Sequence, residues 1–264
     1  MILEKYINML DQSSKDIIKN GYIIFDIEDQ ALLENLKIEF LQYLKKNSIS
    51  VDDLSKLHEY IEIKDLNQLR LGFFNEVNKN EDFNARYLKL GFNNLTNLVG
   101  TELASNKNVN FSLQLPGDTS SKLSIHSDTF SGESEYQINL WVPLTNSYET
   151  NSMFIFNPKF SKSVTDNLSE YEELGIEMLL EKNKEDYVFL NVPYGKGLIF
   201  TPTCLHGNIR NDTDSTRVSF NCRYKNLFSP CNEESGNEKK LGIFYTPLSP
   251  KAATLIGMNN SLKK

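Results

Sequence analysis

The sequence contains little histidine, cysteine or tryptophan. Three histidines, three cysteines and one tryptophan occur in 264 residues. The cysteines, Cys204, Cys222 and Cys231, are odd in number, and no two are spaced as C-x-x-C. This pattern argues against a disulfide framework and against a zinc site built from cysteines. We therefore expect reduced thiols, as in a cytoplasmic protein.

Basic clusters and long apolar runs are also missing. The chain has 28 Lys and Arg against 35 Asp and Glu, so its formal net charge is −7. Without a basic run, neither nucleic acid nor an anionic membrane surface is an expected partner. No apolar run approaches the roughly 18 residues of a membrane span, and the opening residues do not resemble a signal peptide. A cytoplasmic location is the expectation that follows.

Hydrophobic patterning predicts a helical first part of the chain. Helices are expected at residues 1–20, 29–46 and 86–104, and a strand is expected at 21–25. The polar segment 50–80 is expected to be helical in pieces.

A strand-rich second part begins near residue 108. Short alternating segments separated by turn signals continue to Tyr224, a pattern typical of a sandwich or barrel rather than of βαβ units. A helical insertion is expected near 164–183. Residues 231–240 are predicted to be a flexible loop, and the tail from 241 is predicted to be either a lid or a packed extension.

His126 and Asp128 form an H-x-D tripeptide in this second part. Residues two apart on an extended strand point to the same face, so the imidazole and the carboxylate would enter one space. They are two of the three ligands of a 2-His-1-carboxylate site, which leaves open positions on an iron(II) ion. The third ligand must be His58 or His206. His58 is expected on a solvated helix face, where a histidine seldom binds metal.

His206 follows a glycine turn at the end of a strand predicted over 198–206, and another strand is predicted over 216–224. One face of that second strand is entirely polar, because four polar side chains alternate with apolar ones: Arg217, Ser219, Asn221 and Arg223. In a barrel, such a face lines a pocket when the opposite face packs on a core. Arg217 and Ser219 together offer a guanidinium and a hydroxyl suited to a dicarboxylate.

These residues resemble the iron(II)/2-oxoglutarate-dependent dioxygenases, in particular the phytanoyl-CoA hydroxylase-like branch. The resemblance extends over residues 20–45 and 109–225, and the nearest likeness is to bacterial members encoded among surface-carbohydrate biosynthesis genes. The segments that carry it are the opening strand at 20–24, the tryptophan strand and turn at 140–153, and the residues His126, Asp128, His206, Arg217 and Ser219.

The resemblance implies a mainly β fold with N-terminal helices, whose core is a double-stranded β-helix, the cupin-like jelly roll. We expect a single domain over 1–264, with a helical buttress at 1–105, the core at 106–225 and a C-terminal extension at 226–264. It also implies an enzyme, usually a hydroxylase, that uses 2-oxoglutarate and O2 as cosubstrates. Iron(II) would be bound by His126, Asp128 and His206, and the far carboxylate of 2-oxoglutarate by Arg217 and Ser219.

Residues that contact the cosubstrate or the substrate are expected on neighbouring strands. Asn139 and Trp141 share a face with Gln137 and are candidates to contact 2-oxoglutarate, while Gln137 would face the substrate. Arg223, with Gln114 or Lys122, is a candidate to bind an anionic or hydroxyl-rich small molecule, such as a sugar or a nucleotide-activated sugar.

Alternatives remain open at this point. The same chemistry could act on an acyl or amino-acid-like substrate. The chain could instead be a cupin-like metal-binding domain without oxygenase activity, which would not bind 2-oxoglutarate, or a β-rich domain with two ordinary core histidines. The sequence does not distinguish a monomer from a homodimer.

Overall fold

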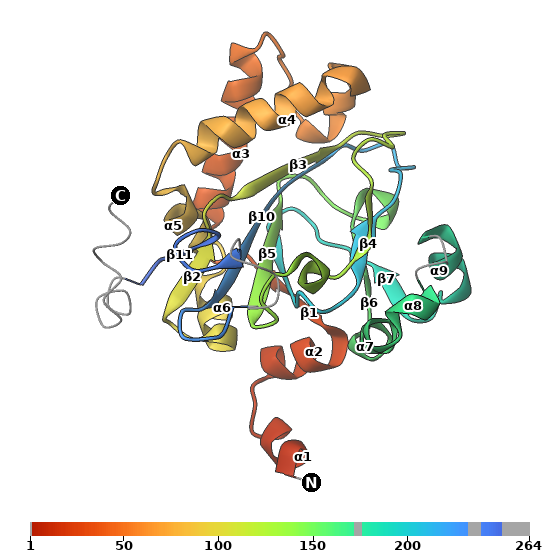
Figure 1. The fold of residues 1–264 in the computed structure, drawn as a ribbon. Helices are drawn as coiled ribbons and strands as arrows, with labels where there is room; N and C mark the ends of the chain where they lie inside the picture. The colour runs from red at the N-terminus through yellow and green to blue at the C-terminus, as the bar shows by residue number, and fades with distance from the viewer. Residues whose placement is uncertain (1, 172–175, 232–238, 250–264) are drawn as a thin grey trace.

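The computed structural model describes residues 2–171, 176–231 and 239–249, and Figure 1 shows their arrangement. Two antiparallel sheets form the body of the molecule. The larger sheet contains, in spatial order, β1 (Tyr22–Asp26), β8 (Lys196–Phe200), β5 (Gln137–Pro143), β10 (Arg217–Asn226), β2 (Leu103–Asn106) and β11 (Tyr245–Pro247), and β3 (Asn110–Gln114) also pairs with β10. The smaller sheet contains β4 (Leu123–His126), β9 (His206–Asn208), β6 (Phe154–Phe156) and β7 (Tyr187–Phe189).

The two sheets face each other across an apolar core. Trp141, Leu198 and Phe200 of the larger sheet pack in one cluster with Ile155 of the smaller sheet. The chain passes repeatedly from one antiparallel sheet to the other, as in a double-stranded β-helix. The predicted fold is therefore confirmed.

Helices cover the outer face of the larger sheet (Figure 1). On β10, Phe220 points outward to this layer, where its ring centroid lies 5.1 Å from Phe111 and 6.2 Å from Phe73. The odd-numbered residues of β10 therefore face the smaller sheet. The covering elements are α3 (Gln30–Lys46), the 3₁₀ helix η1 (Leu54–Glu59), α4 (Ile63–Asn78), α5 (Phe83–Leu88) and α6 (Phe92–Val99).

Two predicted helices are interrupted in the structure. Residues 1–20 form two helices, α1 (Ile2–Ile7) and α2 (Gln12–Asn20), because the Asp11 carboxylate accepts from Ser14 N at 2.8 Å and begins a new helix. The prediction of a single helix over 86–104 was wrong. α5 and α6 occupy most of it, Gly100 ends α6 with a φ of 82°, and β2 begins at Leu103.

The predicted strand over 198–206 was also wrong. β8 ends at Phe200, and His206 begins β9 in the other sheet. The intervening turn is fixed in part by Thr201 N, which donates to Gly21 O at 2.9 Å. The chain therefore crosses from the larger to the smaller sheet just before His206.

The helical insertion flanks the smaller sheet and begins earlier than predicted. Asn157 caps α7 by accepting from Phe160 N at 2.8 Å, and Pro158 occupies the first turn. The insertion consists of α7 (Pro158–Asp166), α8 (Leu168–Tyr171) and α9 (Ile176–Lys182).

The C-terminal extension contributes β11, which pairs with β2. Most of the predicted flexible loop, residues 232–238, and the tail from 250 lie outside the described residues. None of the helices in the described ranges has the length and apolar content needed to cross a membrane.

Candidate metal centre and its cavity

Two histidines and one aspartate meet between β4 and β9. His126 ends β4 and is the cross-strand partner of His206 on β9, with ring centroids 4.3 Å apart. Asp128 opens the short 3₁₀ helix η2 (Asp128–Ser131), and its Oδ1 lies 3.7 Å from His126 Nε2 and 4.0 Å from His206 Nε2. One ligand atom from each residue lies within 4.8 Å of the others, which is compact enough for a single metal ion. His58 is half-buried elsewhere, with Nδ1 3.0 Å from Thr216 Oγ1.

Both imidazoles have a fixed tautomer. His126 Nδ1 lies 2.8 Å from Ser124 O, and His206 Nδ1 lies 2.9 Å from Cys204 O. A carbonyl oxygen can only accept, so each Nδ1 must carry the proton and each Nε2 keeps a lone pair for a metal. Burial lowers the pKa of His206 to about 4, against the opposing charge of Asp128, so the ring is neutral at pH 7.

Asp128 is buried and held by donors on both oxygens. Asn139 Nδ2 donates to Oδ2 at 2.6 Å, and Arg223 Nη2 donates to Oδ1 at 2.9 Å. Burial by itself would raise the pKa of Asp128, but His206, Arg223 and the Asn139 hydrogen bond lower it to about 2. Two imidazoles and an ionised carboxylate form a ligand set that suits iron(II).

Arg217 lies on the same face of β10 and is buried without an ion-pair partner among the described residues, although the charge of buried Asp118 opposes the effect of burial. Its Nη2 donates to Ser112 Oγ at 3.2 Å, and no ion pair links it to any described residue. Arg217 Nε and Ser219 Oγ are buried, and neither has a hydrogen-bond partner within the described ranges. Burial lowers the pKa of Arg217 to about 10, so the guanidinium remains charged at pH 7. Unpaired buried donors of this kind fit a carboxylate ligand.

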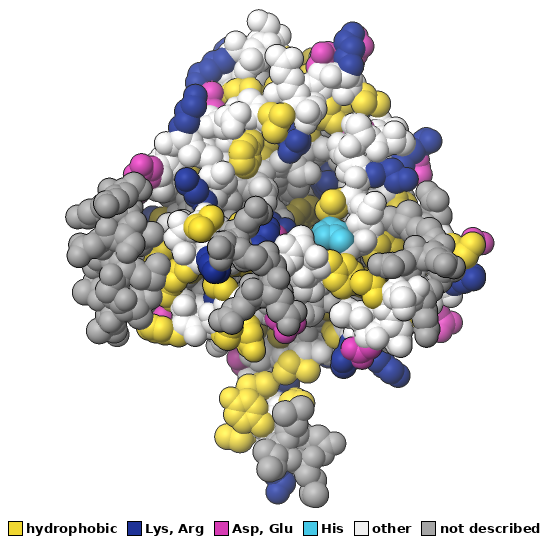
Figure 2. All heavy atoms as spheres, in the orientation of Figure 1, with side chains coloured by type: hydrophobic (Ala, Val, Ile, Leu, Met, Phe, Trp, Pro, Cys, Tyr) yellow, Lys and Arg dark blue, Asp and Glu magenta, His cyan; other side chains and the backbone are white. Residues whose placement is uncertain are grey.

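A cavity of about 840 Å³ connects these groups to the surface. His126, His206, Trp141, Arg217 and Arg223 line its inner part. Figure 2 shows this face of the molecule, which is hollowed next to a histidine side chain.

The outer wall of the cavity comes from α4 and from the segment before β4. Of these residues only Lys122 was predicted from the sequence, and the others were missed, because nothing in the pattern of α4 shows that it lies beside β3. The outer-wall residues are Leu66, Asn67, Arg70, Leu71 and Phe74 on α4, and Ser120, Ser121, Lys122 and Leu123.

Two predicted pocket residues have their side-chain amides engaged by the protein. Gln114 pairs with Arg217 across β3 and β10, and its Nε2 donates to Ile209 O at 2.6 Å. Gln137 donates from Nε2 to Glu133 Oε2 at 2.6 Å and accepts from Tyr245. Lys122 and Trp141, in contrast, line the cavity.

Glu133 is a site residue for which the sequence gives no signal, since it lies in a polar stretch that resembles a surface loop. It is 4% exposed. Its Oε2 lies 2.5 Å from Arg223 Nε, and its Oε1 lies 3.5 Å from Lys239 Nζ. The Arg223 contact is an ion pair without hydrogen-bond geometry, since Arg223 Nε has no hydrogen-bond partner in the part of the chain that the structure describes. Burial raises the pKa of Glu133, and Arg223 and Lys239 oppose the rise.

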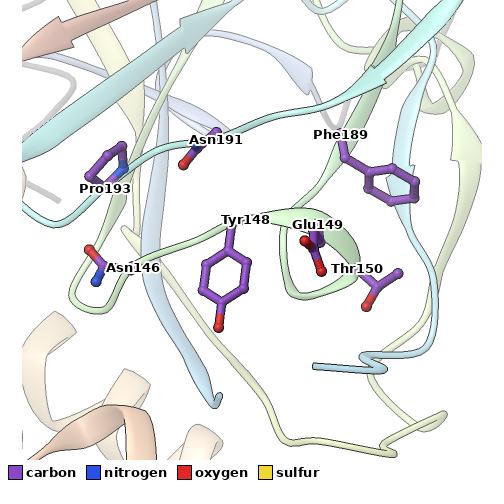
Figure 3. Close-up of a pocket in the computed structure, with 7 residues that line it drawn as sticks. All are labelled: Asn146, Tyr148, Glu149, Thr150, Phe189, Asn191 and Pro193. Carbon is purple, nitrogen blue, oxygen red and sulfur yellow. The ribbon is translucent and has the colours of Figure 1, made fainter. Parts of the chain in front are cut away.

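A second hollow of similar size lies on the surface, away from these groups (Figure 3). It is formed by the chain around Tyr148 and by the segment that runs from Phe189, the last residue of β7, to Pro193. None of the metal-ligand candidates lines it.

The fold has counterparts among solved structures. No protein-family model matches the chain, and no curated protein matches it. The structure is similar to the nickel complex of ThoJ, a non-heme monooxygenase, with a TM-score of 0.55, 16% identity, and coverage of 83% of this chain and 79% of that one. It is also similar to EctD from S. alaskensis with 2-oxoglutarate and 5-hydroxyectoine, with a TM-score of 0.55, 17% identity, and coverage of 86% and 79%. At this identity, the likeness establishes the shared fold.

Proposed function

We propose that this chain is an iron(II)- and 2-oxoglutarate-dependent oxygenase of the phytanoyl-CoA hydroxylase-like branch, which hydroxylates a small polar metabolite. The observation that carries the proposal is a juxtaposition within one cavity. His126 and His206 of the ligand set line the same cavity as Arg217, a buried guanidinium without an ion-pair partner in the described chain. A metal-binding domain without oxygenase activity does not require an anion-binding group in the same cavity as its metal ligands.

The chain's own residues have separate tasks in this function. Iron(II), 2-oxoglutarate and O2 supply the oxidising chemistry when bound. His126, Asp128 and His206 would hold the metal, and Arg217 with Ser219 would bind the far carboxylate of the cosubstrate. Phe200 packs edge-on against His206, with ring centroids 4.9 Å apart.

Water is excluded from one side of the ligands by a buried apolar cluster. Trp141, Met153 and Phe200 belong to this cluster and also line the cavity. A dry wall of this kind strengthens the charge-assisted contacts that Arg217 would make with a carboxylate.

The cavity lining supports an anionic, hydroxyl-rich substrate. Among the described residues that line it, every fully charged side chain is cationic, although the whole chain carries −7. Arg70 and Lys122 are the two cations nearest the surface, and amide and hydroxyl groups surround them on Asn67, Asn110, Ser120, Ser121 and Asn208. A sugar phosphate or a nucleotide-activated sugar of surface-carbohydrate biosynthesis would match both features.

An acyl or amino-acid-like substrate is the second candidate, favoured by a different part of the same wall. Leu71 is 41% exposed and Leu123 is 53% exposed, and both line the cavity with Phe74. These side chains would bury an apolar chain whose anionic end contacts Arg70.

Turnover of 2-oxoglutarate tests the proposal and separates the two substrate classes. Succinate formation would be measured with sugar nucleotides and with acyl and amino acids, and products would be examined for one added oxygen by mass spectrometry. We expect stimulation by a sugar nucleotide and its loss in Arg217→Ala. Arg210→Ala is the matched control, because Arg210 pairs with Asp212 on the surface. No succinate with any substrate in the iron-loaded protein would contradict an oxygenase.

A further inference from the structure

We propose that a buried chain of side chains, from Tyr245 on β11 to Asp128, positions the metal-binding carboxylate and makes the C-terminal extension part of the metal centre. This inference rests on the proposed metal site. Its members, which we call the relay, are Tyr245, Gln137, Glu133, Arg223 and Asp128.

The inner half of the relay is a guanidinium shared between two buried carboxylates. Arg223 Nη2 donates to Asp128 Oδ1 at 2.9 Å, and Arg223 Nε lies 2.5 Å from Glu133 Oε2. The side chains of Asp128 and Glu133 are 2% and 5% exposed. An arginine held in this way cannot move away from Asp128 without leaving Glu133.

The outer half of the relay consists of hydrogen bonds whose directions are fixed. Gln137 Nε2 donates to Glu133 Oε2 at 2.6 Å, so Gln137 Oε1 must accept, and Tyr245 Oη donates to it at 2.5 Å. Tyr245 Oη in turn accepts from Ser134 N at 3.2 Å. Each member therefore restricts the orientation of the next.

The charges of the relay explain why Glu133 is needed. A single guanidinium on Asp128 would compete with a metal ion for the same carboxylate oxygen. Glu133 shares that guanidinium, and Lys239 completes a set of two anions and two cations, with Nζ 3.5 Å from Glu133 Oε1. All partners of Glu133 among the described residues are donors, as an ionised carboxylate requires.

Tyr245 is held in place by the sheet. It is fully buried and is the cross-strand partner of Asn106 on β2, which in turn pairs with β10. β11 thus ties residues that lie beyond β10 in sequence to the carboxylate that opens η2. Groups that support metal ligands in this way commonly change metal affinity about 10- to 100-fold when removed.

The test is a Co(II) titration of the full chain under anaerobic conditions, followed by visible absorption and calorimetry. The variants are Glu133→Gln and Tyr245→Phe. Tyr224→Phe is the matched control, because Tyr224 is also a fully buried tyrosine of the larger sheet but its hydroxyl has no hydrogen-bond partner in the described chain. The melting temperature of each variant is measured in parallel.

We expect Glu133→Gln to weaken Co(II) binding about 10- to 100-fold and to alter the Co(II) spectrum. Tyr245→Phe should shift affinity in the same direction by less, and Tyr224→Phe should bind as the wild type does. Folded Glu133→Gln and Tyr245→Phe proteins with unchanged affinity and only lower melting temperatures would overturn the relay. If Glu133→Gln does not fold, the Co(II) affinity of Tyr245→Phe, which removes only one hydroxyl, tests the relay.

His206→Ala separates this inference from the proposed function. Co(II) binding that is lost in His206→Ala but unchanged in the relay variants refutes the relay alone. A wild-type protein that binds no Co(II) refutes the metal site and the relay together.

Discussion

The two arginines of β10, Arg217 and Arg223, lie on one face of one strand, yet their surroundings are opposite. Arg223 lies between the carboxylates of Asp128 and Glu133. Arg217 is buried, and its only hydrogen bond among the described residues is to a neutral hydroxyl, Ser112 Oγ. A buried charge without an ion pair is costly, and the charge of Asp118 only partly opposes that cost at Arg217. From this difference we expect Arg217 to bind an anionic ligand and Arg223 to stabilise the protein through its ion pairs.

The largest effect that this comparison predicts is on stability. Arg223→Ala leaves two buried carboxylates with less compensation and should lower the free energy of unfolding by about 3–5 kcal/mol. Arg217→Met removes a charge that has no ion pair among the described residues and should cost much less. Urea denaturation of the metal-free proteins measures both, and equal losses would remove the distinction between the two arginines.

The next effect is on cosubstrate affinity. Arg217→Ala should raise the dissociation constant for 2-oxoglutarate about 100-fold, since charge-assisted contacts contribute roughly 1.5–3 kcal/mol. Arg210→Ala should leave it unchanged, because Arg210 is a surface residue that pairs with Asp212. Calorimetric titration of the iron-loaded protein without oxygen gives these constants. Unaltered affinity in Arg217→Ala would place the cosubstrate elsewhere.

The smallest effect concerns the outer wall. Arg70 lines the cavity at α4, and its Nη2 donates to Asn67 Oδ1 at 2.8 Å. Arg70→Ala should raise the KM for an anionic substrate about tenfold, equivalent to one charge-assisted contact of about 1.5 kcal/mol, with little change in kcat. Steady-state kinetics with the best substrate of the turnover screen measures it. A fall in kcat at constant KM would show that Arg70 does not act through substrate binding.

Short-range patterns in the sequence were sufficient to predict much of the fold and of the inner site. The alternation of polar and apolar residues predicted the polar face of β10, and the H-x-D spacing made His126 and Asp128 candidate metal ligands. Of the two candidates for the third ligand, the structure brings His206 next to His126 and Asp128, although its strand begins only at His206 itself.

Long-range partners could not be read from the sequence. Arg223 was predicted only as a substrate contact, and it does line the cavity, but the sequence does not show that Glu133 and Asp128, 90 and 95 residues earlier, lie against its side chain. Leu103–Asn106 resembles the end of a helix and becomes a strand only by pairing with β10 and β11. The cavity wall on α4 depends in the same way on where the helix packs, and helical periodicity does not encode that.

The most direct test of the account is an anaerobic spectrum. Iron(II) is added to the purified chain, then 2-oxoglutarate, and the visible region is examined for a metal-to-ligand charge-transfer band. We expect a band in the wild-type protein that is absent from His206→Ala and strongly reduced in Arg217→Ala at the same 2-oxoglutarate concentration. A folded wild-type protein that binds iron(II) and gives no band would contradict the oxygenase and leave a plain metal-binding domain.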